Sequence, residues 1–232
     1  MKREKKLFKK WKEKYRENNF GFIEDGIIDE EIWGKQPVKV VLLFKEWNDG
    51  GHDSNDEMYS FLKNGARYSV NKNEPTFKKM TQWVIGLHDE NVEYKDLPKI
   101  NQEICSREMS KVACVNIKKR PGNERASNTE LKKYVVSDAE FIKEQLELYS
   151  DANVYITCGG IVSDLIMNHV NSFNGTSWQS SSNNEIFRIG TKGEIFIKYG
   201  HPAGTKYTDE EYYNRLMTCY KQAILFKRKN NL

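Results

Sequence analysis

The stretch that decides the fold spans residues 38–44 and reads VKVVLLF. It is a near-continuous run of β-branched and aliphatic residues, which is typical of a strand buried on both faces of a parallel sheet. Three more runs of this kind follow, at 111–117 (KVACVNI), 153–158 (NVYITC) and 194–199 (EIFIKY). The sequence therefore predicts four strands in one sheet.

Helical patterns separate these strands and follow the last one. They cover residues 76–87, 137–149, 160–170 and 208–227. Ser137 is a plausible N-cap, and Thr208 with Glu211 has the spacing of a capping box. Strands that alternate with helices favour one α/β domain over residues 1–232, a three-layer α/β/α sandwich around a four-stranded, mainly parallel sheet. Ligands of such sheets bind at the carboxyl ends of the strands.

The positive charge lies mainly at the N-terminus. The formal net charge is +4, and the first 17 residues contain nine Lys or Arg against three Glu. Leu7, Trp11 and Tyr15 recur every fourth residue between these lysines, which predicts an amphipathic basic helix over residues 3–17. We expect its apolar stripe to pack on the domain, with a membrane-surface helix as the less favoured alternative. A packed helix can still turn its lysines toward nucleic-acid phosphate.

Composition excludes several classes of protein. No apolar run approaches the ~20 residues that span a bilayer, and the N-terminus is too charged for a signal peptide, so we expect a cytoplasmic protein with no membrane partner. The cysteines are far apart and form no C-x-x-C pair, which argues against a zinc ribbon or a disulfide framework. They are Cys105, Cys114, Cys158 and Cys219. The acidic and histidine residues at 52–57 match no metal motif, and we predict neither a metal nor a cofactor.

Polar residues follow the predicted strands. Asn48 and Asn116 lie at the ends of the first two, Gly159 and Gly160 follow the third, and His201 follows the fourth. If the strands are parallel, the two carboxamides and the imidazole converge on one rim, beside a basic cluster. This cluster is Lys118, Lys119, Arg120 and Arg125. Such a set suits a polar ring held over a phosphodiester.

Each of these residues also has a purely structural interpretation. His201 precedes a proline and suits a turn or an N-cap, and Asn48 precedes Asp49-Gly50 and suits a left-handed turn. The basic cluster can be a solvated loop. Residues 171–184 are polar and predict a long surface loop, and residues 48–73 also have an irregular pattern.

The motifs at the strand ends resemble those of the uracil-DNA glycosylase superfamily, most closely its thermophilic-type branch, family 4. Residues 115–125, VNIKKRPGNER, are similar to that branch's N-V-V-K-C-R-P-P-G-N-R motif, and His201-Pro202-Ala203 is similar to its His-Pro-Ser motif. Residues 140–160 resemble its helix and third strand. The likeness covers residues 38–48 and 111–225. Lys119 stands where that branch has an iron–sulfur ligand, so no cluster is expected.

The resemblance implies an enzyme that acts on double-stranded DNA as a monomer and extrudes a base from the stack. It implies that His201 donates to the departing base, that Asn48 positions water and that Asn116 reads the base edge. Candidates for stacking on the base are Trp47, Tyr59 and Tyr68. Candidates for gripping the DNA are the basic cluster with Gly159 and Gly160, and Gly204, Lys206 and Tyr207 occupy the place of the intercalating loop.

The base itself is less closely specified. The first motif, residues 45–49, lacks the superfamily's proline, and with Gly50-Gly51 and the polar segments this predicts an enlarged pocket. The odd motif and overall size resemble a superfamily member that removes α-glucosyl-hydroxymethylcytosine from phage DNA as antiviral defence and leaves abasic sites. Two alternatives stay open: a repair enzyme for uracil or another deaminated base, and a catalytically silent DNA-binding module.

Overall fold

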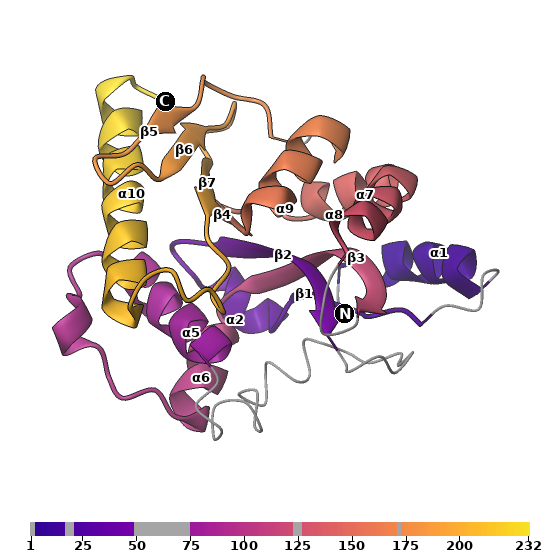
Figure 1. The fold of residues 1–232 in the computed structure, drawn as a ribbon, viewed down its shortest axis with the longest axis horizontal. Coiled ribbons are helices and arrows are strands. Elements are labelled where there is room, and N and C mark those ends of the chain that lie inside the picture. The colour runs from indigo at the N-terminus through magenta and orange to yellow at the C-terminus, as the bar shows by residue number, and fades with distance from the viewer. Residues whose placement is uncertain (1–2, 17–20, 49–74, 123–126, 171–172) are drawn as a thin grey trace.

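The protein has an α/β fold built on one mixed seven-stranded sheet (Figure 1). The computed structural model describes residues 3–16, 21–48, 75–122, 127–170 and 173–232. In this part of the chain the strands have the order β1-β3-β2-β4-β7-β6-β5. Their bounds are β1 Gly26–Ile27, β2 Val40–Asn48, β3 Ala113–Gly122, β4 Val154–Cys158, β5 Gln179–Ser180, β6 Ile186–Ile189 and β7 Ile195–Tyr199.

The four predicted strands form the centre of this sheet. β2 runs parallel to both β3 and β4, and β4 runs parallel to β7. The sheet is larger and more mixed than predicted, because β1 pairs antiparallel with β3 and the β6–β5 hairpin adds antiparallel to β7. The loop prediction for residues 171–184 was wrong at Gln179 and Ser180, which pair with β6. Polar residues suit such an edge strand, since one of its sides faces away from the sheet.

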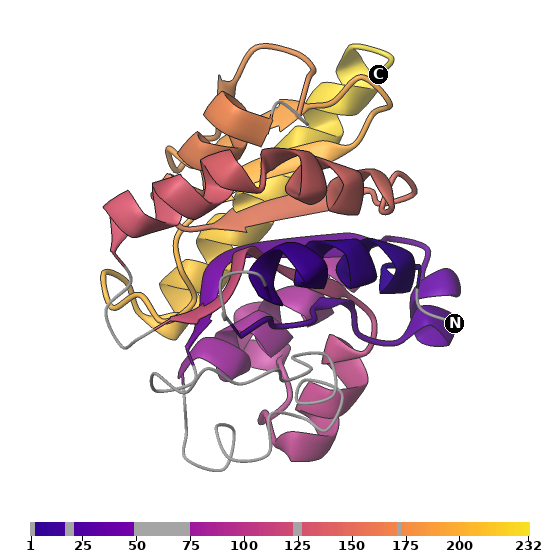
Figure 2. The same cartoon turned by 90° about the vertical axis from the view of Figure 1, so that its right-hand side faces the viewer.

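Helices lie on both faces of the sheet (Figures 1 and 2). The bounds are α1 Lys5–Arg16, α2 Glu30–Gly34, α5 Pro75–His88, α6 Gln102–Met109, α7 Asn128–Ser137, α8 Ala139–Glu147, α9 Gly160–Leu165 and α10 Asp209–Lys229, with a 3₁₀ turn at Tyr94–Asp96 and a π turn at Ile166–Val170. One apolar cluster packs α5, α6 and α10 against the sheet, and a second packs α1, α7, α8 and α9 against it. The four cysteines are buried free thiols in the first of these clusters.

Two predicted helix starts have different outcomes. The capping box at Thr208 and Glu211 is confirmed and opens α10. The N-cap at Ser137 was wrong, because Ser137 is the last residue of α7 and α8 begins after Asp138. The Asp138 carboxylate caps no helix. It accepts hydrogen bonds from Lys14 Nζ at 2.5 Å and from the Tyr15 hydroxyl at 2.7 Å, and these bonds hold α1 against the start of α8.

The N-terminal helix packs on the domain, as predicted. Leu7, Phe8, Trp11 and Tyr15 are buried in the cluster shared with α8, and the Trp11 ring stacks on Phe141 with centroids 5.3 Å apart. The helix lies beside α8 (Figure 2). The helix also carries exposed cations, namely Lys5, Lys6, Lys9, Lys10 and Arg16. The apolar stripe is therefore used for folding, and the lysines remain at the surface.

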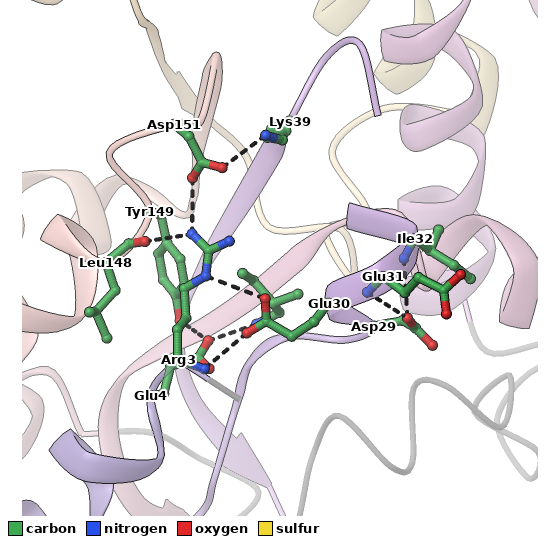
Figure 3. Close-up of polar contacts among 11 residues, drawn as sticks. Arg3, Glu4, Asp29, Glu30, Glu31, Ile32, Lys39, Leu148, Tyr149 and Asp151 are labelled. Atoms are coloured by element: carbon green, nitrogen blue, oxygen red, sulfur yellow. Dashed lines mark hydrogen bonds and ion pairs between the residues drawn. The ribbon is translucent and has the colours of Figure 1, made fainter. Parts of the chain in front are cut away.

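Ion pairs fix the start of this helix (Figure 3). The Arg3 guanidinium pairs with Glu30 at 3.3 Å and with Asp151 at 3.1 Å. Behind it, Glu4 accepts from the Tyr149 hydroxyl at 2.7 Å, and burial raises the pKa of Glu4. These contacts join α1 to α2 and to the turn before β4, and they begin a polar network that continues inward.

Candidate active site

The carboxyl ends of β3, β2, β4 and β7 meet at one end of the sheet. The chain passes from β2 to β3 on one side and then returns to β4 on the other side of β2. A topological switch point therefore lies between β2 and β4, and ligands of open α/β sheets bind outside the strand ends at such a point. Cys158 and Tyr199, the last residues of β4 and β7, lie beside each other at this end. Phe44 lies beside Asn116 within β2 and β3, which continue to Asn48 and Gly122.

His201 follows β7 in a tight turn. Its Nδ1 accepts a hydrogen bond from the backbone N–H of Ala203 at 3.1 Å, and its carbonyl accepts from the N–H of Gly204 at 2.8 Å. Its ring meets the Phe44 ring edge to face, with centroids 6.2 Å apart. Burial, with a smaller contribution from Lys45, lowers the pKa of His201. The neutral imidazole must then carry its proton on Nε2, because Nδ1 is already an acceptor.

The turn that holds His201 is anchored from α5. The Lys79 ammonium group, almost fully buried, donates to the Gly204 carbonyl at 2.8 Å and lies 3.5 Å from Asp209. It also lies 4.5 Å from the centroid of the Tyr212 ring. A side chain at Gly204 would collide with the Tyr212 hydroxyl, so glycine is required there. Lys79 and Gly204 therefore define the position of His201, and the sequence pattern did not identify Lys79.

Asn116 lies inside the protein at the same end of the sheet. It is 1% exposed and is the register partner of Phe44, so contact between its side chain and a base would require the residues that cover it to move. Its backbone N–H donates to Asp25 Oδ2 at 2.7 Å, and its side-chain Nδ2 donates to the same oxygen at 3.3 Å. Phe44 therefore neighbours both Asn116 and His201. The sequence pattern marked Phe44 only as a strand residue and did not identify Asp25.

The structure corrects two of the predicted phosphate contacts. Lys119 is completely buried, donates to Asp25 at 2.5 Å, and lies over the rings of Phe8 and Trp11. Burial lowers the pKa of Lys119, and the Asp25 carboxylate opposes that shift. A lysine with no exposed surface cannot reach a DNA backbone. The motif around Lys119 gave no indication of this burial.

Lys118 is also engaged within the protein. It is 3% exposed and pairs with Glu46 and, at 3.1 Å, with Glu130. Its phosphate role was therefore a wrong prediction, because two carboxylates already neutralise it. Arg120 is only partly buried and donates to the Tyr134 hydroxyl at 3.0 Å. It stays a candidate for contact with DNA.

The glycine turn after β4 is open, as its predicted role requires. Gly159 has φ +118°, a conformation that favours glycine, and a Cβ atom added to Gly159 or Gly160 would meet no atom of the described residues within 4 Å. In the loop after His201, Lys206 is exposed, whereas Tyr207 packs on Tyr212 at 5.4 Å beneath the Arg215 guanidinium. Insertion of Tyr207 into a base stack would require it to leave this packing.

Other predicted site residues are only partly described. Trp47 is half-buried and packs against the apolar cluster of α5 and α10. Asn48 ends β2 beside Gly122, and only its backbone is described. Tyr59, Tyr68 and Arg125 lie outside the described residues, as do the acidic and histidine residues at 52–57. The predicted roles of these residues stay predictions.

Two kinds of feature are absent from the described part of the chain. No three His, Cys, Asp or Glu residues there are grouped in a way that would hold a metal ion. No helix there is long and apolar enough to cross a bilayer. The chain matches no protein-family model and no curated protein. The residues at the strand ends are therefore the basis for a functional conclusion.

Proposed function

We propose that the protein is a monofunctional DNA glycosylase that extrudes a modified pyrimidine and hydrolyses its N-glycosidic bond. One observation carries the proposal: Phe44, which follows the last residue of β2 that pairs with β4, is both the register partner of Asn116 and a ring contact of His201. An amide that can read a base edge and an imidazole that can donate to a base are thus neighbours of one aromatic residue, and that residue lies on β2, beside the switch point of the sheet.

The chemistry assigns separate tasks to these groups. Water adds to the sugar carbon as the bond to the base breaks, and the base leaves with the bonding electrons. Neutral His201, with its proton on Nε2, is suited to donate a hydrogen bond to the oxygen on which this charge collects. A pre-aimed donor of this kind is worth about 10²–10³ in rate. Asn48, at the end of β2, is proposed to position the water on the opposite side of the sugar.

Extrusion of a base costs a few kcal/mol, which contacts to the DNA must offset. We assign that task to the exposed lysines of α1, to Arg120 and to the open turn at Gly159. The helices on both faces of the central parallel strands are compatible with the glycosylase-like three-layer sandwich. Acting on a single duplex, the enzyme would work as a monomer.

A modified cytosine is the proposed base. A cavity of about 430 Å³ has Gly200, the residue before His201, in its lining, whereas Phe44, Asn116 and His201 are not among its lining residues. Asn184 and Glu185 line it together with Tyr207 and Arg215, so amide, carboxylate and guanidinium groups surround aromatic rings. Polar groups beside an aromatic platform suit a hydroxylated adduct better than an unmodified uracil. With the resemblance of the first motif, this favours α-glucosyl-hydroxymethylcytosine in phage DNA.

The test uses three DNA substrates of the same length. Purified protein is incubated with uracil-containing, unmodified and glucosylated phage DNA, and alkaline heating then converts abasic sites to strand breaks. The proposal expects breaks in the glucosylated DNA, and loss of those breaks in His201→Ala. Breaks confined to uracil DNA would instead identify a repair enzyme. No breaks in any DNA, with binding retained, would identify a silent DNA-binding module.

A further inference from the structure

The most densely bonded buried carboxylate in the described part of the chain is that of Asp25. Its Oδ2 accepts from the backbone N–H and from the Nδ2 of Asn116, at 2.7 and 3.3 Å. Its Oδ1 accepts from Lys119 Nζ at 2.5 Å and from Gln145 Nε2 at 3.0 Å. The four N–H groups that donate to this carboxylate belong to three residues, Asn116, Lys119 and Gln145.

Lys119 supplies the charge that allows this carboxylate to be buried. The lysine is 0% exposed, donates also to the Asn116 carbonyl at 2.8 Å, and lies 5.2 Å from the Trp11 ring centroid. A buried ion pair is seldom more stabilising than apolar residues of the same volume. Folding stability alone therefore does not account for the pair, and its contact with the amide of Asn116 suggests another role.

The contact fixes which way the Asn116 carboxamide points. An amide has donors at one end and an acceptor at the other. Rotating that of Asn116 by half a turn would place its oxygen against Asp25 Oδ2, which replaces a hydrogen bond with repulsion. Uracil presents O4 as acceptor and N3–H as donor, and cytosine presents N4–H₂ as donor and N3 as acceptor. The two bases thus require opposite orientations of a reading amide.

We propose that Asp25 is a positioning residue that holds the Asn116 carboxamide in one orientation and thereby determines which pyrimidine edge the site accepts. The proposal rests on the proposed function for its substrate. The Asp25–Lys119 pair, rather than Asn116 alone, is then the origin of discrimination between uracil-type and cytosine-type bases. The charged residues that face this pair are Glu4 and Asp138, and both remain unaltered in the test.

The test compares variants that change the pair with one that does not. Asp25→Asn can accept or donate toward Asn116 and frees the amide to rotate. Combining it with Lys119→Met removes both buried charges, so no lone ammonium group remains to unfold the protein. Gln145→Met is the matched control, because it removes a different donor from the same carboxylate and leaves Asn116 bonded. Urea unfolding verifies that each variant is folded.

The first readout is the ratio of single-turnover rates on two duplexes that differ only in carrying a uracil-type or a cytosine-type base. We expect the double variant to lose about tenfold or more of the wild-type ratio, and Gln145→Met to keep it. A folded double variant with the wild-type ratio would overturn the specificity role.

The second readout does not depend on activity. In protein labelled with ¹⁵N-asparagine, the side-chain NH₂ signal of Asn116, assigned with Asn116→Ala, should be protected from hydrogen exchange. We expect that protection to be lost in the double variant and kept in Gln145→Met. Unchanged protection in the double variant would overturn the positioning role. If wild-type protein removes no base from any DNA, the proposed function fails, while this measurement still decides whether Asp25 orients Asn116.

Discussion

Two adjacent lysines of α5 allow the anchoring of His201 to be tested. Lys79 is 4% exposed, and its ammonium group holds the Gly204 carbonyl in the turn that contains His201. In Lys79→Met that carbonyl loses its donor, and an unsatisfied polar group costs about 1–3 kcal/mol of unfolding free energy. Asp209 keeps its ion pair with Lys78 at 2.8 Å, so no carboxylate is left unpaired.

Lys78→Met is the matched control. Its side chain is 40% exposed and pairs with the same Asp209, and such a surface pair contributes about 0–1 kcal/mol. Lys78 makes no described contact with the His201 turn. Urea unfolding should therefore separate the two variants by about 1–2 kcal/mol, with Lys79→Met the less stable.

The effect on chemistry should be larger than the effect on stability. A donor displaced by about 1 Å costs up to ~10²-fold in rate, so we expect Lys79→Met to reduce the single-turnover rate about tenfold or more, with DNA affinity unchanged. Lys78→Met should keep the wild-type rate. Equal rates in the two variants, or a destabilised Lys79→Met with full activity, would refute the anchoring of His201 by Lys79.

Three further predictions concern pH, salt and the N-terminal helix. Burial lowers the pKa of His201 below 6.5, the usual value for histidine. The excision rate should therefore be constant above pH 6.5 and fall only at lower pH, where Nδ1 gains a proton that repels the Ala203 N–H. A midpoint of the rate profile above pH 6.5 would contradict this. Replacing three exposed lysines of α1, Lys5, Lys6 and Lys9, with glutamine should make the plot of log binding constant against log salt less steep by up to ~3, about 0.9 for each phosphate that is no longer neutralised. An unchanged slope would place the DNA elsewhere. Trp11→Ala should lower the unfolding free energy by about 3–5 kcal/mol, because the ring is completely buried; a decrease below ~1 kcal/mol in urea unfolding would show that α1 is not docked in solution.

Sequence patterns predicted the parts of the fold whose physics is local. The central strands are continuous apolar runs, and the capping box of α10 is complete within four residues, so both could be recognised without tertiary information. The edge strands β1 and β5, and β6 next to β5, were missed because they are short. The pairing of β1 also depends on β3, which is distant in the chain.

The candidate site was predicted less completely, for a different reason. His201 follows the end of β7, where a parallel sheet brings residues together whatever their spacing, whereas Asn116 lies within β3, which continues to Gly122. Asp25 lies 91 residues from Asn116, and the pattern around it does not indicate that a carboxylate is buried there. The burial of Lys119 and Lys79 was not predicted, because a lysine is ordinarily at the surface. Only the folded chain shows the carboxylate that binds Lys119 and the carbonyl that binds Lys79.

The most direct measurement is a crystal structure of the protein bound to a duplex that carries a non-cleavable 2′-fluoro analogue of glucosylated hydroxymethylcytidine. The account predicts that the base is extruded and lies against Phe44, with its edge facing Asn116. It also predicts that His201 Nε2 lies about 2.7–3.2 Å from the base oxygen, a normal hydrogen-bond distance. A base that stays stacked in the duplex, or one that binds away from Phe44, would contradict the account.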